Sequence, residues 1–161
     1  ETRTLAEREL CGLGNLEFTF TGELPHHAVA ALYRDAPVDV LVNTSESEGV
    51  PVSIMEAMSA GVPVVAPDVG GISSLVSARC GVLLGPQPDA EEIAEAMARV
   101  ALADGHARLR ANARQAIEAG FDAARNYHDF VADIVALGAT GDSPARRRQR
   151  AAPAIQHAAG R

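Results

Sequence analysis

Residues 45–71 read SESEGVPVSIMEAMSAGVPVVAPDVGG, and this stretch decides the fold. Pro51 is expected to open a short helix, because its missing N–H would be unsatisfied at the first helical position anyway. The apolar run 62–66 has the composition of a buried strand, and the double glycine 70–71 is typical of a tight turn after it. The stretch therefore predicts a helix that leads directly into a buried strand.

Periodicity extends this pattern over most of the chain. Helices are expected at 2–11, 28–33, 72–77, from Asp89 onward, 106–118 and 122–137, and strands at 16–21, 38–42, 62–66 and 81–84. Asp89 followed by Glu92 is a capping box at the start of its helix. Strands that alternate with helices predict an α/β fold with a Rossmann-like parallel sheet and flanking helices.

The last predicted helix and the segment after it differ from the rest. In 122–137, Tyr127, Phe130, Val131, Ile134 and Val135 recur at helical spacing and are expected to be buried. We expect residues 1–138 to form one domain and the Arg- and Ala-rich residues 139–161 to be a disordered tail.

Composition narrows the class of protein. The 161 residues carry a net charge of −7, and residues 1–140 hold nine arginines against twenty acidic residues, a net charge of −11. Such an acidic body argues against nucleic acid as a partner. No apolar run approaches the roughly 18 residues of a membrane span. Cys11 and Cys80 lack the spacing of a metal site and suggest a reducing compartment, so a cytoplasmic location is expected.

The chemistry centres on two glutamates. Ligands of an open parallel sheet bind beyond the carboxyl ends of its strands, and Glu48 lies in the loop that follows the strand 38–42. The backbone amides of Val52 and Ser53 point out of the next helix and suit an anionic diphosphate. Glu56 lies one turn into that helix, where its carboxylate suits the vicinal hydroxyls of a ribose. Taken singly, each acid has a plainer interpretation: a loop glutamate is usually solvated, and a glutamate near a helix start often just complements the helix dipole.

Several motifs together resemble one family, the GT-B-fold retaining glycosyltransferases of family 4 (group 1), in its C-terminal donor-binding domain. The family's E-x7-E signature matches Glu48 to Glu56, and its Ser-x-x-Glu-Gly matches Ser45 to Gly49. Its Glu-Ala-Met-x-x-Gly-x-Pro-Val-Val matches 56–65, and its double glycine matches 70–71. Phe18, Phe20 and Gly22 resemble the strand and glycine of the base pocket. The resemblance covers about residues 5–137.

The resemblance implies roles for these positions. Glu48 would hold the hydroxyls of the transferred sugar and is the candidate catalytic residue, while Glu56 would hold the ribose. Sugar and phosphate contacts would come from the residues that follow Glu48 along the chain: Gly49, Val50, Val52 and Ser53. Gly22 and Ser45 would lie at the base pocket. The donor would be a UDP-, GDP- or ADP-sugar, with no metal and no cofactor, and transfer would be a front-side displacement that retains the anomeric configuration.

Departures from the family's pattern shape the expected partners. Ser74 stands where the family usually has a glutamate, and the sequence contains no lysine for the diphosphate clamp. The N-terminal acceptor domain is also missing, so we expect a donor-domain fragment, truncated at its N-terminus and inactive alone. Two alternatives remain open: a non-catalytic module that binds nucleotide sugars or needs a partner, and a scaffold. The arginines at 146–150 suit either a solvated tail or a peripheral membrane contact.

Overall fold

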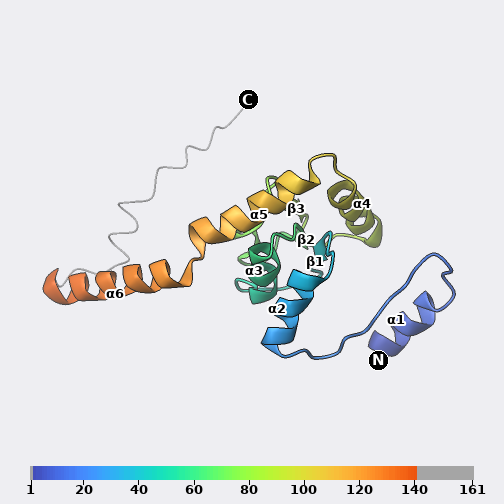
Figure 1. Ribbon diagram of the computed structural model, residues 1–161, viewed down its shortest axis with the longest axis horizontal. Coiled ribbons are helices and arrows are strands. Elements are labelled where there is room, and N and C mark those ends of the chain that lie inside the picture. Colours follow the sequence, from blue (N-terminus) through green and yellow to red (C-terminus); the bar gives the residue numbers. More distant parts are fainter. Residues whose placement is uncertain (1, 141–161) are drawn as a thin grey trace. The chain divides into compact units, whose positions relative to one another are not determined.

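The computed structural model describes residues 2–140 of the chain, which fall into two compact units, one up to Val38 and one from Asp39 onward. The expected tail, including the arginines at 146–150, lies almost entirely outside the described residues. Figure 1 shows the order of the elements along the chain.

The first unit contains two helices, α1 (Thr2–Leu10) and α2 (His26–Asp35). Pro25 is the N-cap of α2 with an extended backbone, because a residue with φ fixed near −65° is easily placed just before a helix. The Phe18 and Phe20 rings meet edge to face at 5.6 Å between centroids, and the Arg3 guanidinium lies 5.3 Å from the centre of the Phe20 ring.

The strand expected at 16–21 is absent from the first unit, and that prediction was wrong. Its alternation of Leu16, Phe18 and Phe20 is that of a strand, but all three side chains are exposed and the segment has no ladder partner among the described residues. A strand is defined by its hydrogen bonds to a neighbour, so a suitable sequence without that neighbour stays irregular.

The second unit is built on a three-stranded parallel sheet in the order β1-β2-β3. Its strands are β1 (Leu41–Val42), β2 (Val64–Pro67) and β3 (Gly81–Leu84). Val64 pairs with Leu41 on one side and with Gly81 on the other, so β2 is the central strand and all four of its residues are buried. The strands at 62–66 and 81–84 are thus confirmed within two residues, while β1 is shorter than expected.

Helices cover both faces of this sheet (Figure 1). They are α3 (Val52–Ser59), α4 (Ala90–Ala101) and α5 (His106–Gly120), with a short 3-10 turn, η1 (Ile72–Ser74), after β2. Val64 and Ala66 of β2 pack with α3, η1 and α5, whereas Val65 packs with α4. The two-residue alternation of a strand thus assigns β2 side chains to two separate apolar layers.

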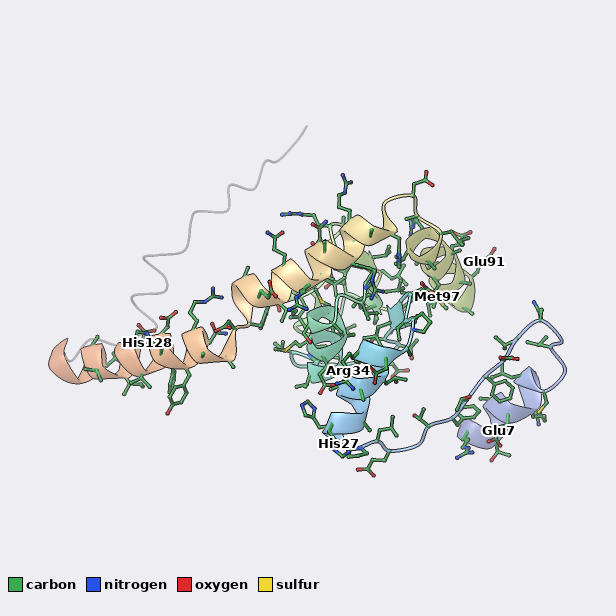
Figure 2. All side chains as sticks on the ribbon, in the orientation of Figure 1. Glu7, His27, Arg34, Glu91, Met97 and His128 are labelled. Atoms are coloured by element: carbon green, nitrogen blue, oxygen red, sulfur yellow. The ribbon has the colours of Figure 1, made fainter. Side chains whose placement is uncertain are left out.

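Local sequence features fix the helix ends. The Asp89 side chain accepts a hydrogen bond from Glu92 N–H at 2.8 Å, and Glu92 Oε2 accepts one from Asp89 N–H at 2.9 Å, so the predicted capping box is confirmed. In α4, Val100 is buried as its position on the apolar face suggests. Met97, labelled in Figure 2, remains 38% exposed.

The last helix, α6 (Ala123–Thr140), forms where it was expected but does not bury its apolar residues. Tyr127 is 72% exposed, Phe130 60% and Val135 67%, and every residue from 122 to 135 is exposed. Figure 2 shows these side chains as sticks, with His128 labelled. Helical spacing shows which residues share a face, but it does not show what covers that face.

Candidate functional site

The loop after β1 is organised by Asn43. Its backbone N–H donates to Val65 C=O at 2.9 Å, which extends the β1–β2 ladder by one residue. Its side-chain Oδ1 then accepts from Ser45 N–H at 2.9 Å, and its Nδ2 donates to Glu48 Oε1 at 3.3 Å. One side chain at the end of the strand therefore shapes the turn and positions the Glu48 carboxylate.

Asn43 was not among the residues singled out from the sequence. The pattern that identifies it is an asparagine directly after a buried strand and two residues before a serine, because asparagine side chains commonly accept a hydrogen bond from the backbone two residues on. Glu48 itself is half-buried, as a carboxylate in the wall of a crevice would be.

The double glycine after β2 supports the same loop from the other side. Gly71 N–H donates to Gly49 C=O at 2.6 Å. Gly70 has φ +56°, and a Cβ on it would lie 1.8 Å from the Glu48 carbonyl oxygen, while a Cβ on Gly71 would lie 2.5 Å from the Gly49 oxygen. Only glycine allows this approach, so the turn 70–71 and the loop around Glu48 form one packed unit.

The N-terminus of α3 follows this loop directly. Pro51 is the N-cap and not the first helical residue, so the helix begins one position later than expected, at Val52. The first intrahelical bond runs from Met55 N–H to Pro51 C=O at 3.3 Å, and no side chain caps the end. The amides of Val52, Ser53 and Ile54 are therefore the donors that a helix leaves unsatisfied at its start. The side chains of Val52 and Ser53 are exposed, while Ile54 anchors the helix in the core.

Glu56 is the fifth residue of α3 and is half-buried. A helical side chain leans toward the N-terminus of its helix, so its carboxylate is biased toward the same end as the amides of Val52 and Ser53. Ser59 Oγ donates to the Glu56 backbone carbonyl at 2.7 Å, which holds the backbone here and not the carboxylate. The structure thus gathers Glu48, the exposed Gly49 and Val50, and the start of α3 in one loop–helix corner.

The two residues predicted to lie at the base pocket, Ser45 and Gly22, belong to different units of the chain. Ser45 lines a cavity of about 420 Å³ at the carboxyl ends of the three strands, together with Glu46, Pro67 and Gln87. Gly22 has φ +65° and belongs to the first unit. Their assignment to a base pocket stays a prediction.

Among the described residues, no three histidine, cysteine, aspartate or glutamate side chains gather in a way that would hold a metal ion. Within residues 2–140, no helix has both the length and the apolar character that crossing a membrane requires.

A parallel sheet with helices on both faces, and a polar loop–helix corner beyond its carboxyl edge, is the arrangement of nucleotide-binding α/β proteins. The sequence model of the family Glycosyl transferases group 1 matches residues 1–102. Because that match covers more than half of the chain, the chain belongs to this family.

Individual relatives agree with the assignment. A GDP-mannose-dependent alpha-mannosyltransferase of Mycolicibacterium smegmatis is 50% identical over 66 residues, which are 40% of this chain and 17% of the relative. Sucrose-phosphate synthase from Thermosynechococcus elongatus has a similar structure, with a TM-score of 0.67 and 31% identity over 84% of this chain and 35% of the synthase.

A second solved structure, TarM of Staphylococcus aureus in complex with UDP, aligns with a TM-score of 0.61 and 19% identity over 81% of this chain and 25% of that protein. Both structural neighbours are GT-B glycosyltransferases, so the expected fold class is confirmed. The chain spans about a sixth of the length of the curated mannosyltransferase and about a third of the synthase.

Proposed function

We propose that this chain provides the donor-binding half of a retaining glycosyltransferase, which transfers a sugar from a nucleoside diphosphate to an acceptor hydroxyl. The observation that carries the proposal is the loop–helix corner, where Asn43 holds the Glu48 carboxylate immediately before the uncapped N-terminus of α3. Membership of the group 1 family supports the same reaction class.

Each part of the corner has a role in this proposal. The amides of Val52 and Ser53 donate to the phosphate next to the sugar, where the positive end of the α3 dipole favours negative charge. The Glu48 carboxylate accepts hydrogen bonds from the sugar hydroxyls, and Gly49 and Val50 line the pocket for the same sugar. Glu56 accepts from the two ribose hydroxyls, since a carboxylate offers an oxygen to each.

The proposed reaction is a front-side displacement. The bond between the anomeric carbon and the diphosphate oxygen breaks, and the acceptor oxygen bonds to the same face of that carbon. The acceptor proton passes to the leaving phosphate, so the step needs no further base and no metal. The α3 amides lower the barrier because the leaving diphosphate gains charge where those donors already point.

The nucleotide and the acceptor are the less defined parts of the proposal. One relative is named for GDP-mannose and one structural neighbour was solved with UDP, which makes GDP and UDP candidates. ADP is a third candidate, on the family resemblance alone. We further propose that the chain catalyses sugar transfer only when an acceptor domain is supplied. A hexose donor incubated with the chain and simple sugar acceptors is then expected to give no transfer product, and turnover by the chain alone would contradict this part.

Calorimetric titration with UDP, GDP and ADP tests the donor site. We expect one nucleotide to bind, and Glu56→Ala to weaken that binding at least about tenfold, because a hydrogen bond to a charged group is worth roughly 1.5–3 kcal/mol. Glu48→Ala is expected to weaken binding of the matching nucleotide sugar more than that of the nucleotide.

Glu95→Ala is the matched control, since Glu95 is an exposed acid on α4, outside the loop–helix corner and the Ser45 cavity. Equal effects of Glu95→Ala and Glu48→Ala would reject a specific role for Glu48. Binding that survives Glu56→Ala unchanged would reject the ribose assignment. Binding of the donor without turnover, even after an acceptor domain is supplied, would favour a non-catalytic binding module.

A further inference from the structure

A cavity lies at the opposite edge of the sheet, among arginines that the proposed function does not use. Arg79 immediately precedes Cys80 and β3, and α5 begins at His106, whose Nε2 lies 2.9 Å from the carbonyl oxygen of Asp39, two residues before β1. These elements therefore meet at the amino ends of the strands. The loop–helix corner around Glu48 follows the carboxyl ends of the strands. The cavity and this corner therefore lie at opposite edges of one sheet.

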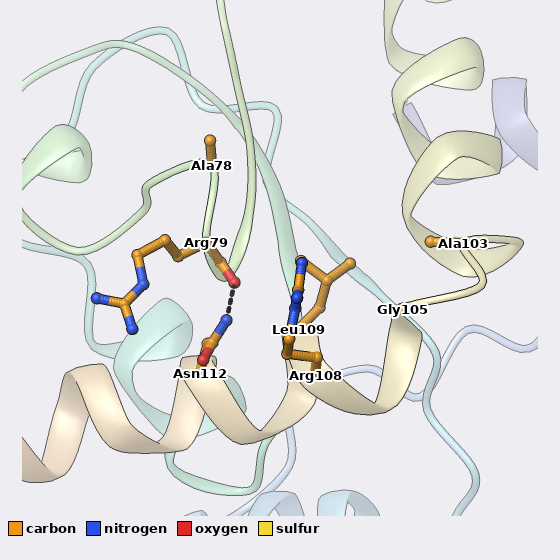
Figure 3. A pocket seen from close by; sticks show the side chains of 7 residues that line it. All are labelled: Ala78, Arg79, Ala103, Gly105, Arg108, Leu109 and Asn112. Carbon is orange, nitrogen blue, oxygen red and sulfur yellow. Dashed lines mark hydrogen bonds between the residues drawn. The ribbon is translucent and has the colours of Figure 1, made fainter.

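This amino edge contains a cavity of about 530 Å³ (Figure 3). Asn112 Nδ2 donates to the Arg79 carbonyl at 2.8 Å, which ties α5 to the turn before β3. Arg79 comes from that turn and Arg108 from the first turns of α5, and in Figure 3 they stand on opposite sides of Asn112. Leu109 and Ala103 supply the apolar part of the wall.

The charges around this cavity are segregated. Residues 1–140 hold twenty acidic residues and only nine arginines, yet Arg79 and Arg108 line the cavity and Arg99 lines an adjoining one that shares Ala103 and Leu109. No acidic residue lines either cavity, although Asp104 lies in the connecting loop between α4 and α5. A local excess of positive charge on an acidic protein concentrates anions there.

The two guanidinium groups are also available. Arg34 and Arg114 each form an ion pair with a carboxylate at 2.7 to 2.8 Å. Within residues 2–140, neither Arg79 nor Arg108 has such a pair, and both side chains are exposed. Each planar guanidinium therefore keeps its donors for an oxyanion, to two oxygens of which it can donate parallel hydrogen bonds.

We propose that the cavity between Arg79, Arg108 and Asn112 binds a small phosphate-bearing anion, at a site separate from the donor site. The two arginines neutralise the phosphate charge from two elements, and the apolar wall accommodates a carbon skeleton attached to it. The proposal does not depend on the glycosyl transfer reaction. It requires only the geometry of the turn before β3 and of α5.

Titration of the isotope-labelled chain with inorganic phosphate, followed in amide spectra at constant ionic strength, tests the proposal. We expect saturable shifts at the backbone amide of Gly105 and the side-chain amide of Asn112. Arg79→Gln and Arg108→Gln should each weaken binding by about five- to tenfold, because each removes a charge-assisted contact. Saturable shifts confined to Val52 and Ser53 would place phosphate at the donor site alone and overturn the proposal.

Arg114→Gln is the control, since it removes the same charge from the same helix at a residue already paired with Glu118. It should change the affinity less than twofold. Equal weakening by Arg114→Gln and Arg108→Gln would show diffuse charge attraction and overturn the proposal, as would the absence of saturable shifts at Gly105 and Asn112. Both lining arginines are exposed, so their variants are expected to fold, and circular dichroism checks this.

Discussion

At the scale of single residues, the loop–helix corner depends on two glycines, which have no side-chain chemistry of their own. Gly70 and Gly71 bring the turn after β2 against the backbone of Glu48 and Gly49, with Gly71 N–H bonded to Gly49 C=O. The position of the Glu48 carboxylate is therefore set by backbone packing as well as by Asn43.

Gly70→Ala tests this packing. The new Cβ would lie 1.8 Å from the Glu48 carbonyl oxygen, and φ +56° is unfavourable for alanine. We expect the free energy of unfolding to fall by at least about 2 kcal/mol in urea denaturation. Gly85→Ala is the control, because a Cβ there meets no atom within 4 Å. Similar losses in the free energy of unfolding in both variants would show that Gly70 is not packed against the loop around Glu48.

Asn43→Asp tests how Glu48 is held. The substitution keeps an acceptor for Ser45 N–H but replaces the donor to Glu48 with a second carboxylate at about the same distance, originally 3.3 Å. Two like charges in contact repel, so binding of the nucleotide sugar should weaken at neutral pH and partly recover at acidic pH, where one carboxylate is protonated. Asn126→Asp on α6 controls for added charge, and an equal loss of affinity there would contradict the expectation.

At the scale of elements, α3 connects the core to the proposed site. Its buried side chains Ile54 and Met58 pack with β2 and α5, while Val52 and Ser53 at its start are exposed. The helix is short, so its direction depends on this packing more than on intrinsic helix propensity. Stability and donor binding should therefore both respond to changes at its buried face.

Met58→Ala and Met97→Ala form a matched pair for this argument. Met58 is fully buried in α3, and its truncation should cost about 2–5 kcal/mol in the free energy of unfolding. Met97 is 38% exposed on α4, and the same change there should cost less than about 1 kcal/mol. Thermal or urea unfolding measures both, and a larger loss at Met97 would contradict the packing of α3 against β2.

Elements with local determinants were predicted well from the sequence. The helix expected at 106–118 and the capping box of Asp89 and Glu92 were confirmed, because each depends on residues close together in the chain. Features that depend on a distant neighbour were not. The segment 16–21 has the alternating pattern of a strand but no described strand pairs with it. The apolar residues of α6 around Tyr127 have helical spacing, but they are exposed and not buried as expected. Asn43 was missed because its role appears only once the loop closes on Glu48.

At the scale of the whole molecule, stability is expected to be unevenly distributed. The central strand β2 is paired on both sides and fully buried, whereas α6 has helical hydrogen bonds but exposed side chains throughout 122–135. Residues 11–23 form no helix or strand. Amide protection depends on hydrogen bonding together with buried contacts, so these three parts should open with different free energies.

Native-state hydrogen exchange measures this order directly. We expect the amides of β2 to exchange only through global unfolding, which for a domain of this kind costs about 5–15 kcal/mol. The amides of α6 should exchange earlier through local fraying, and those of 16–21 should exchange with little protection. Protection at 16–21 equal to that of β2 would show that this segment does pair as a strand. It would then restore the expectation drawn from Leu16, Phe18 and Phe20, and contradict the irregular conformation described for the first unit.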